Sequence, residues 1–311
     1  MIKQTPTVIA ALLLALAAIA CLAACGGNPS VPPDDTASTT APEITTAPES
    51  HEATTAATEA TEPVTDPATA EVTTSAPEIN VVKKAVISGG GAGSKTYTAA
   101  FSLIDKKNPN VIVLCTAGRD TVSNITSYVN SMKRYSRNVE AIALSTTLYD
   151  PEELRAKIVG ADLIIVGGGQ SEYMYSTWEK FDVDKYLIEA YNSGVVCIGG
   201  SAGGMCWTYA AWNDFYELPE SVYKWFYGLD VINIYYGPHF SNSALWAGFD
   251  KAILGLTEPK YNVGYAMENG TALVFIDGQI VKSIREAGTE HIYEYKFNGT
   301  SWTKAEFAYT D

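Results

Sequence analysis

Histidine and cysteine are scarce in this chain, and their scarcity narrows the chemistry that it can perform. The 311 residues include three histidines and five cysteines. Cys21 and Cys25 fall in an apolar N-terminal run, and Cys115, Cys197 and Cys206 lie in apolar surroundings without the spacing of a metal site. We therefore expect three buried free thiols and no metal centre, with a Cys197–Cys206 disulfide as the alternative.

Basic residues are also few. The net charge is −14, from 21 Lys and Arg against 35 Asp and Glu. Ten of the acids, and no base, lie in residues 26–80, so the rest of the chain is only mildly acidic. No basic patch or stripe is present in the sequence, which argues against a nucleic-acid partner.

Residues 1–25 are expected to be a lipoprotein signal peptide. Lys3 precedes an apolar run, which ends in "LAAC" at Cys25. Cleavage before Cys25 would leave its thiol to carry the lipid. An ordinary secretory signal or a short membrane anchor is the alternative. Because no other stretch is long and apolar enough to cross a bilayer, we expect an exported protein on the bacterial cell surface, attached to the membrane through its N-terminal lipid only.

Residues 26–80 are expected to form a disordered tether rich in Thr, Pro and Glu. Almost no large apolar side chain occurs among them. Such a segment cannot bury enough apolar surface to offset its chain entropy. Its prolines and like charges favour an extended spacer.

Residues 81–311 are expected to form one α/β domain, with a doubly wound, mostly parallel sheet and helices on both faces. Apolar runs alternate with stretches of helical spacing, which is typical of this class. The expected strands are 84–88, 110–118, 138–145, 161–169 and 194–200. The expected helices are 94–107, 123–135, 151–159 and 182–192. Past residue 260 the pattern predicts extra antiparallel strands, with hairpin turns at Asp277-Gly278 and Asn298-Gly299.

Three glycine-rich stretches follow expected strands, at 89–93, 167–169 and 199–204. In doubly wound sheets, ligands bind at the carboxyl ends of the strands. The first stretch lacks the full spacing of a dinucleotide fingerprint, so no organic cofactor is expected. The third contains Gly-Gly-Ser-Ala-Gly, the pattern of a sharp strand–nucleophile–helix turn. Ser201 is therefore the candidate nucleophile, and a small residue in a tight turn is the alternative.

A serine nucleophile needs a base and an acid that orients the base. His239, in the loop "YYGPHFSN", is the candidate base, whereas His291 lies in a strand-like alternating pattern. Asp214 follows a helix-like apolar segment, 205–212, and is the candidate acid. Glu217, one helical turn further on, is its rival.

The chain from Lys84 to Gly278 resembles the dipeptidase E and cyanophycinase family of serine peptidases, which has a class I glutamine amidotransferase-like, flavodoxin-like fold. The resemblance rests on "TAG" (116–118), "DLIIVGGGQSEYM" (162–174), "GVVCIGGSAGGM" (194–205), "GPHF" (237–240) and "GYAMENGTALVF" (264–275). It implies Ser201 as nucleophile and His239 as base, with Asp214 or Glu217 as the acid. It also implies an oxyanion hole, which the N–H groups of Gly168 or Gly169 and of Ala202 form.

These features predict an exported, lipid-anchored serine peptidase that hydrolyses peptide or isopeptide bonds of small peptides. A catalytically inactive surface module that binds peptides or cell-wall fragments is the alternative, and acyl transfer to an amine is a third reading. Family members that prefer an N-terminal aspartate carry an arginine downstream of the histidine, and "HFSNSALWAGFDKAIL" has none. The sequence leaves open the substrate and the choice between a monomer and a homodimer.

Overall fold

The computed structural model describes residues 80–215 and 222–309. The expected signal peptide, with Cys25, and the expected tether up to residue 79 lie outside the described residues. Glu217 also lies outside them.

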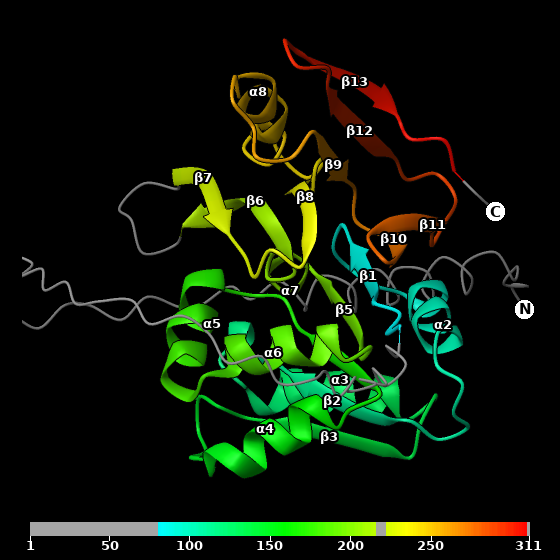
Figure 1. Ribbon diagram of the computed structural model, residues 1–311, viewed down its shortest axis with the longest axis vertical. Coiled ribbons are helices and arrows are strands. Elements are labelled where there is room, and N and C mark those ends of the chain that lie inside the picture. Colours follow the sequence, from blue (N-terminus) through cyan, green and yellow to red (C-terminus); the bar gives the residue numbers. More distant parts are fainter. Residues whose placement is uncertain (1–79, 216–221, 310–311) are drawn as a thin grey trace, which may run out of the picture. The chain divides into compact units, whose positions relative to one another are not determined.

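The larger sheet has seven strands in the order β11-β10-β1-β5-β4-β2-β3 (Figure 1). Five neighbouring strands of this sheet are parallel: β1 (Lys84–Ser88), β2 (Asn110–Leu114), β3 (Asn138–Ile142), β4 (Leu163–Val166) and β5 (Val196–Gly200). Two antiparallel strands complete one edge, β10 (Thr271–Ile276) and β11 (Gln279–Arg285). The prediction of a mostly parallel sheet with added antiparallel strands is confirmed.

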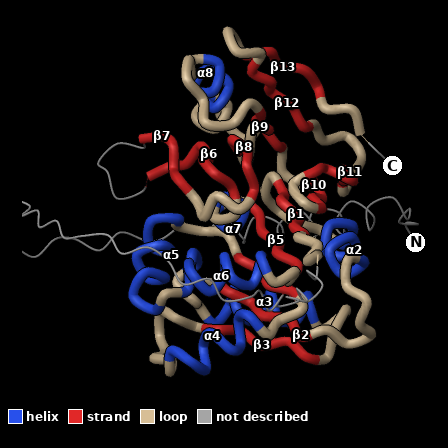
Figure 2. The backbone as a smooth tube through the Cα atoms, in the orientation of Figure 1, coloured by secondary structure: helices blue, strands red, loops and turns tan. Residues whose placement is uncertain are grey.

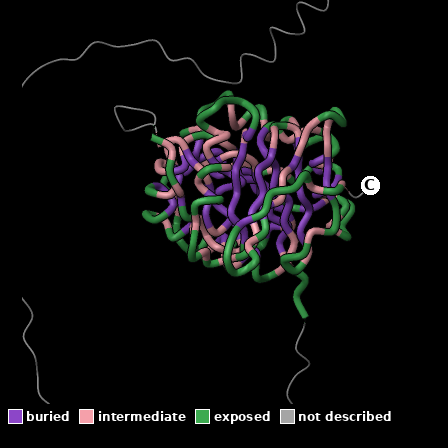
Figure 3. The backbone as a smooth tube through the Cα atoms, turned by 90° about the horizontal axis from the view of Figure 1, so that it is seen from above, coloured by how far each residue is buried: buried purple, intermediate pink, exposed green. Residues whose placement is uncertain are grey.

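Helices cover both faces of this sheet, as Figure 2 shows. Side chains that alternate along β1 face opposite cores: Ala85 and Ile87 face one, and Val86 faces the other. The first core includes side chains of α4 (Pro151–Val159), α5 (Ser171–Trp178) and α6 (Val183–Asn192). The second includes side chains of α2 (Ser94–Ser102) and α3 (Val122–Met132). Seen from above in Figure 3, buried segments lie inside and exposed segments lie outside. Because the two cores hold helices on opposite faces, the sheet is doubly wound as expected.

Local signals placed several helices correctly. Asp150 caps α4, since its side chain accepts hydrogen bonds from the backbone N–H groups of Glu152 and Glu153, each at 3.0 Å. Pro151 occupies the first turn, where its missing N–H costs nothing. Helix α5 was not predicted, because its sequence, "SEYMYSTW", mixes aromatic and polar residues without a strong helical period.

A second, six-stranded sheet has the order β13-β12-β9-β8-β6-β7. Its strands are β6 (Thr208–Phe215), β7 (Val222–Tyr227), β8 (Ile232–Gly237), β9 (Val263–Met267), β12 (Ile292–Phe297) and β13 (Trp302–Glu306). Helix α8 (Gly248–Leu254) packs on one face through Phe249 and Ile253. The sequence predicted some of these strands but not that they form a separate sheet.

The prediction of a helix at 205–212 is wrong. A short helix, α7, covers only Ala202–Met205, and β6 begins at Thr208. Strand β6 pairs with β7 on one side and β8 on the other. Ladder hydrogen bonds and cross-strand aromatic packing outweigh the weak helical preference of this segment. Asp214 therefore lies on a strand and not beyond the end of a helix.

The predicted hairpin turns are present. Asp277 and Gly278 join β10 to β11 with φ angles of 48° and 76°, which a type I′ turn requires. Gly299, with φ of 94°, lies in the turn between β12 and β13.

The three cysteines that the structure describes are free and buried, as predicted. Burial raises the pKa of the Cys115 thiol to about 12, so this group stays protonated at neutral pH. Within residues 80–215 and 222–309, no helix is long and apolar enough to span a membrane.

Candidate active site

Ser201 lies at the turn between β5 and α7, in a backbone conformation that few residues other than glycine adopt. Its φ and ψ angles are 55° and −133°. The neighbouring glycines allow this turn: a Cβ atom on Gly199 would lie 2.0 Å from the carbonyl oxygen of Gly203. The start of α7 thus packs directly on the strand backbone, which leaves no room for a side chain. This geometry is a sharp, strained turn between a strand and a helix, as the sequence pattern predicts.

A buried tyrosine contacts the backbone of this turn. The hydroxyl of Tyr236, on β8, donates a hydrogen bond to the carbonyl oxygen of Ser88 at the end of β1. The backbone N–H of Ser201 interacts with the same hydroxyl. Burial raises the pKa of Tyr236 far above its usual range, so the phenol remains neutral. Tyr236 therefore links the second sheet to the backbone of the candidate nucleophile.

His239 lies in the loop after β8 and reaches the same edge of the larger sheet. Its backbone N–H donates to the carbonyl oxygen of Gly89 at 2.8 Å. A Cβ atom on Gly90 would lie 2.4 Å from Cε1 of His239, and one on Gly200 would lie 3.5 Å from the Cα of Gly90. Gly90 thus occupies the space between the Ser201 turn and the His239 ring. The glycines after β1 serve this close approach, and the fold brings Ser201 and His239 to one edge.

The ring of His239 is held by an amide that the sequence analysis did not identify. Nδ1 of His239 lies 2.5 Å from Oδ1 of Asn269, which follows β9. The indole of Trp246 also packs against the imidazole, with ring centroids 4.9 Å apart. The only sequence signal for Asn269 is its position, a polar residue before Gly270 where a strand ends.

Burial lowers the pKa of His239 below its ordinary value. The hydrogen bond with Asn269 and the charge of Asp214 act in the opposite direction, with smaller effect. The imidazole is therefore neutral at neutral pH, as a general base must be. With the proton on Nδ1 and directed at Asn269, the lone pair of Nε2 is free to accept another.

Asp214 acts on His239 through charge and not through contact. It lies on β6, opposite Tyr223 of β7. Among the hydrogen bonds of the described residues, none joins Asp214 to His239, and its influence on the His239 pKa is coulombic.

Of the glycines that follow β4, Gly168 lies beside Ser201. A Cβ atom on Gly168 would lie 3.2 Å from Cβ of Ser201 and 3.6 Å from its Oγ. The N–H of Gly168 interacts with the hydroxyl of Tyr128. Gly169 follows with φ of 144°. Ala202 opens α7, and the N–H of a first helical residue has no partner within its helix.

His291 has a different environment. Its Nδ1 lies 2.8 Å from a carboxylate oxygen of Glu306 on β13, and this hydrogen bond raises the pKa of His291. The pair is exposed to solvent. Of the two histidines that the structure describes, His239 is therefore the one that approaches Ser201.

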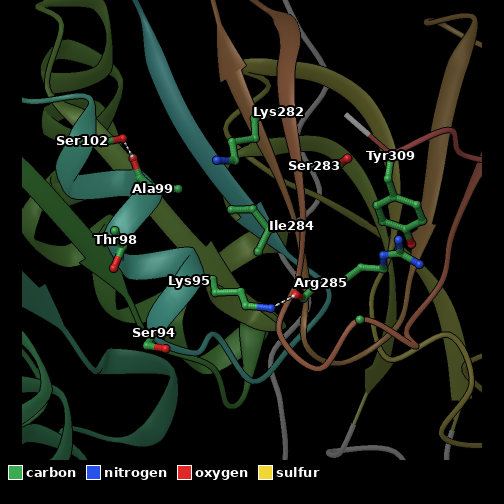
Figure 4. A pocket seen from close by; sticks show the side chains of 11 residues that line it. Ser94, Lys95, Thr98, Ala99, Ser102, Lys282, Ser283, Ile284, Arg285 and Tyr309 are labelled. Atoms are coloured by element: carbon green, nitrogen blue, oxygen red, sulfur yellow. Dashed lines mark hydrogen bonds between the residues drawn. The ribbon is translucent and has the colours of Figure 1, made fainter. Parts of the chain in front are cut away.

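A hollow of about 680 Å³ between α2 and β11 contains none of the predicted site residues. Lys95 and Ser102 line it from α2, and Lys282 and Arg285 line it from β11 (Figure 4). The Arg285 guanidinium lies over the ring of Tyr309, 3.9 Å from its centroid. This hollow is distinct from the edge that carries Ser201 and His239.

Known proteins that are similar to this chain are peptidases. Residues 85–283 match the model of peptidase family S51. The chain is 25% identical over 213 residues to the uncharacterized peptidase YgaJ of Bacillus subtilis (strain 168), which covers 65% of this chain and 87% of YgaJ.

The crystal structure of a peptidase from an acI-B1 Actinobacterium has a similar fold. It superposes with a TM-score of 0.51 at 20% identity, over 73% of this chain and 97% of the other. The family match spans both the Ser201 turn and the His239 loop, and it confirms the resemblance to dipeptidase E. The chain belongs to peptidase family S51 and is a serine-type peptidase of the dipeptidase E kind.

Proposed function

We propose that this protein is an exported, lipid-anchored peptidase that hydrolyses peptide or isopeptide bonds of small peptides, with Ser201 as nucleophile and His239 as general base. The observation that carries the proposal is the left-handed turn at Ser201, flanked by Gly168 and by the loop of His239. A non-glycine residue persists in such a conformation only where the surrounding structure imposes it, and such residues cluster at active sites.

The proposed reaction has two halves. Oγ of Ser201 attacks the carbonyl carbon while Nε2 of His239 takes the hydroxyl proton, and the same proton then passes to the leaving amine. Water then attacks the acyl-enzyme. His239 takes a proton from the water and gives it to Oγ of Ser201 as the ester bond breaks. No step requires a resident cofactor.

Backbone N–H groups stabilise the oxyanion in this proposal. Ala202 supplies one donor, and Gly168 or Gly169 supplies the other. We favour Gly169, because the N–H of Gly168 interacts with Tyr128. Each such donor contributes about 3 kcal/mol in the transition state.

Two side chains serve His239 in different ways. Asn269 keeps the proton on Nδ1 by accepting its hydrogen bond, which supports the tautomer that a base needs. We retain Asp214 as the proposed acid, since its charge favours the imidazolium that forms during attack. Glu217 remains the rival.

Anchoring is proposed from the sequence. The apolar run that ends in "LAAC" supports lipid attachment at Cys25, and the acidic segment that follows would hold the catalytic domain away from the membrane.

Labelling with a fluorophosphonate probe tests the mechanism, because the probe reacts with activated serines only. The wild-type chain should label and Ser201→Ala should not, with peptide hydrolysis lowered by about 10⁴-fold or more. Ser193→Ala is the matched control, since this exposed serine follows α6 and lies before β5, whereas Ser201 lies after it. Turnover by a folded Ser201→Ala chain at the wild-type rate would refute the assignment.

A further inference from the structure

We propose that the hydroxyl of Tyr236 is a positioning group for the reaction, because it fixes the backbone of Ser201 relative to the loop that carries His239. The inference rests on the proposed function and adds a residue to the same site. Tyr236 is fully buried, so it acts through other residues and not on the substrate.

The turn at Ser201 needs support from other parts of the chain. Helix α7, which follows it, has only four residues, and a helix of that length is not stable by itself in water. The φ and ψ angles of Ser201, 55° and −133°, are a conformation that a non-glycine residue keeps only where its surroundings impose it. Contacts from distant segments therefore hold this turn.

Tyr236 supplies such a contact, with its hydroxyl acting as donor and as acceptor. The hydroxyl donates to the carbonyl oxygen of Ser88 and accepts the backbone N–H of Ser201. A Cβ atom on Gly204 would lie 3.0 Å from the hydroxyl oxygen and 3.1 Å from a ring carbon of Tyr236. The absence of a side chain at Gly204 thus lets the phenol reach the turn.

The acceptor of the Tyr236 proton lies directly beside the turn. Ser88, the last residue of β1, pairs with Gly200 in the parallel register of β1 and β5. A Cβ atom on Gly200 would lie 3.2 Å from the carbonyl oxygen of Ser88. The phenol therefore joins the end of β1 to the backbone of the residue that follows Gly200, which is Ser201.

His239 is attached to the same strand end. Its backbone N–H donates to the carbonyl oxygen of Gly89 at 2.8 Å, and Gly89 directly follows Ser88. Only two residues separate Tyr236 from His239 along the chain. The Tyr236 hydroxyl and the His239 N–H thus bind successive carbonyl groups, and the hydroxyl also holds Ser201. Displacement of the phenol would move Ser201 relative to His239, and a misplacement of about 1 Å can cost about 10²-fold in rate.

The contact is independent of pH in the range of activity measurements. Burial raises the pKa of Tyr236 far above its usual range, so the phenol keeps the proton that it donates to Ser88. Loss of the hydroxyl should therefore lower the rate equally at every pH, without moving the titration of His239.

Tyr236→Phe in the full-length chain removes the oxygen and keeps the ring. At saturating fluorophosphonate, we expect the rate constant for labelling of Ser201 to fall about 10- to 100-fold, because attack on the probe needs the same placement of Oγ and His239. The probe concentration that gives half the maximal rate should stay near the wild-type value, since the buried phenol does not contact the probe. The acid limb of the labelling rate against pH should also stay in place.

Tyr295→Phe is the matched control. Tyr295, on β12 of the second sheet, is also fully buried, and its hydroxyl donates to Asp250 at 2.8 Å. This variant loses a buried hydrogen bond away from Ser201, so it should melt at a lower temperature and label at the wild-type rate. Gly204→Ala is a second test, since its methyl group would press on the phenol and should slow labelling as well.

Labelling of a folded Tyr236→Phe chain at the wild-type rate would overturn the inference. Equal slowing in Tyr295→Phe would overturn it too, because the effect would then be a general loss of stability. If Tyr236→Phe does not fold, labelling of Gly204→Ala decides, and a wild-type rate there contradicts the inference. A wild-type chain that does not label at all would refute the proposed function itself, which is a different result from any of these.

Discussion

Asn269 presents its carbonyl oxygen to Nδ1 of His239 at 2.5 Å, the position in which a carboxylate was expected. An amide and a carboxylate both fix the tautomer, but only a carboxylate adds charge beside the ring. The two contributions are divided here between Asn269, which contacts the ring, and Asp214, which acts on it from β6.

Asn269→Asp should shift the acid limb of the kcat/KM profile to higher pH. A carboxylate at Nδ1 favours the imidazolium, so the pKa of His239 rises, by about one to three units, and a higher pH is needed to keep the base neutral. Asn269→Ala should lower kcat by about 10²-fold, because the ring loses the acceptor that fixes its tautomer. Peptide hydrolysis between pH 4 and 9 measures both. Wild-type profiles in both variants would exclude a positioning role for Asn269.

Asp214→Asn should shift the same limb in the opposite direction. Removing the nearby negative charge lowers the pKa of His239 further, and kcat should fall by about 10²-fold as the imidazolium loses support. Glu217→Gln is the comparison and should stay near wild type. If Glu217→Gln collapses while Asp214→Asn does not, Glu217 is the acid.

Gly90→Ala should abolish most of the activity. The added methyl group would lie 2.4 Å from Cε1 of His239 and 2.5 Å from Oδ1 of Asn269, so the pair must separate. Gly91→Ala is a matched control, because that glycine also has a positive φ but no atom lies within 4 Å of its Cβ position. The rate of peptide hydrolysis is measured for both variants, and thermal melts confirm that both fold. Equal losses in both would indicate backbone strain and not contact with His239 and Asn269.

The histidines of the catalytic domain should titrate on opposite sides of pH 6.5. Burial lowers the pKa of His239, and the hydrogen bond to Glu306 raises that of His291. Proton NMR of the imidazole signals measures both values, with His51→Gln used to identify the third histidine. Glu306→Gln should bring the His291 value down and leave that of His239 in place. A His239 value above 6.5 would remove the basis for a neutral resting base.

Cys25→Ala should release the protein from the membrane fraction of a bacterial host. The thiol is the proposed point of lipid attachment, and no acyl chain can be added to alanine. Partition into detergent compares the variant with the wild type, and Cys21→Ala serves as the control. Unchanged partition of Cys25→Ala would contradict lipid anchoring at this residue.

Local sequence determined much of this protein. Alternating apolar runs and helix caps specify the parallel sheet, since hydrophobic period and capping act over a few residues. The glycines around Ser201 likewise predict the sharp turn that the structure has there, because a residue with positive φ between a strand and a helix tolerates only small neighbours. His239 could be chosen as the candidate base because it is one of only two histidines beyond residue 80.

The surroundings of His239 were decided by tertiary structure alone. Asn269 reaches the ring because β9 pairs with β8 and ends beside the loop that carries His239, a contact that no local pattern encodes. The segment after the nucleophile became β6 and not a helix, since strand pairing with β7 and β8 outweighs its local preference. That change placed Asp214 on a sheet, from which it reaches His239 by charge only. Sequence names the candidate nucleophile and base, whereas long-range packing selects the groups that contact them.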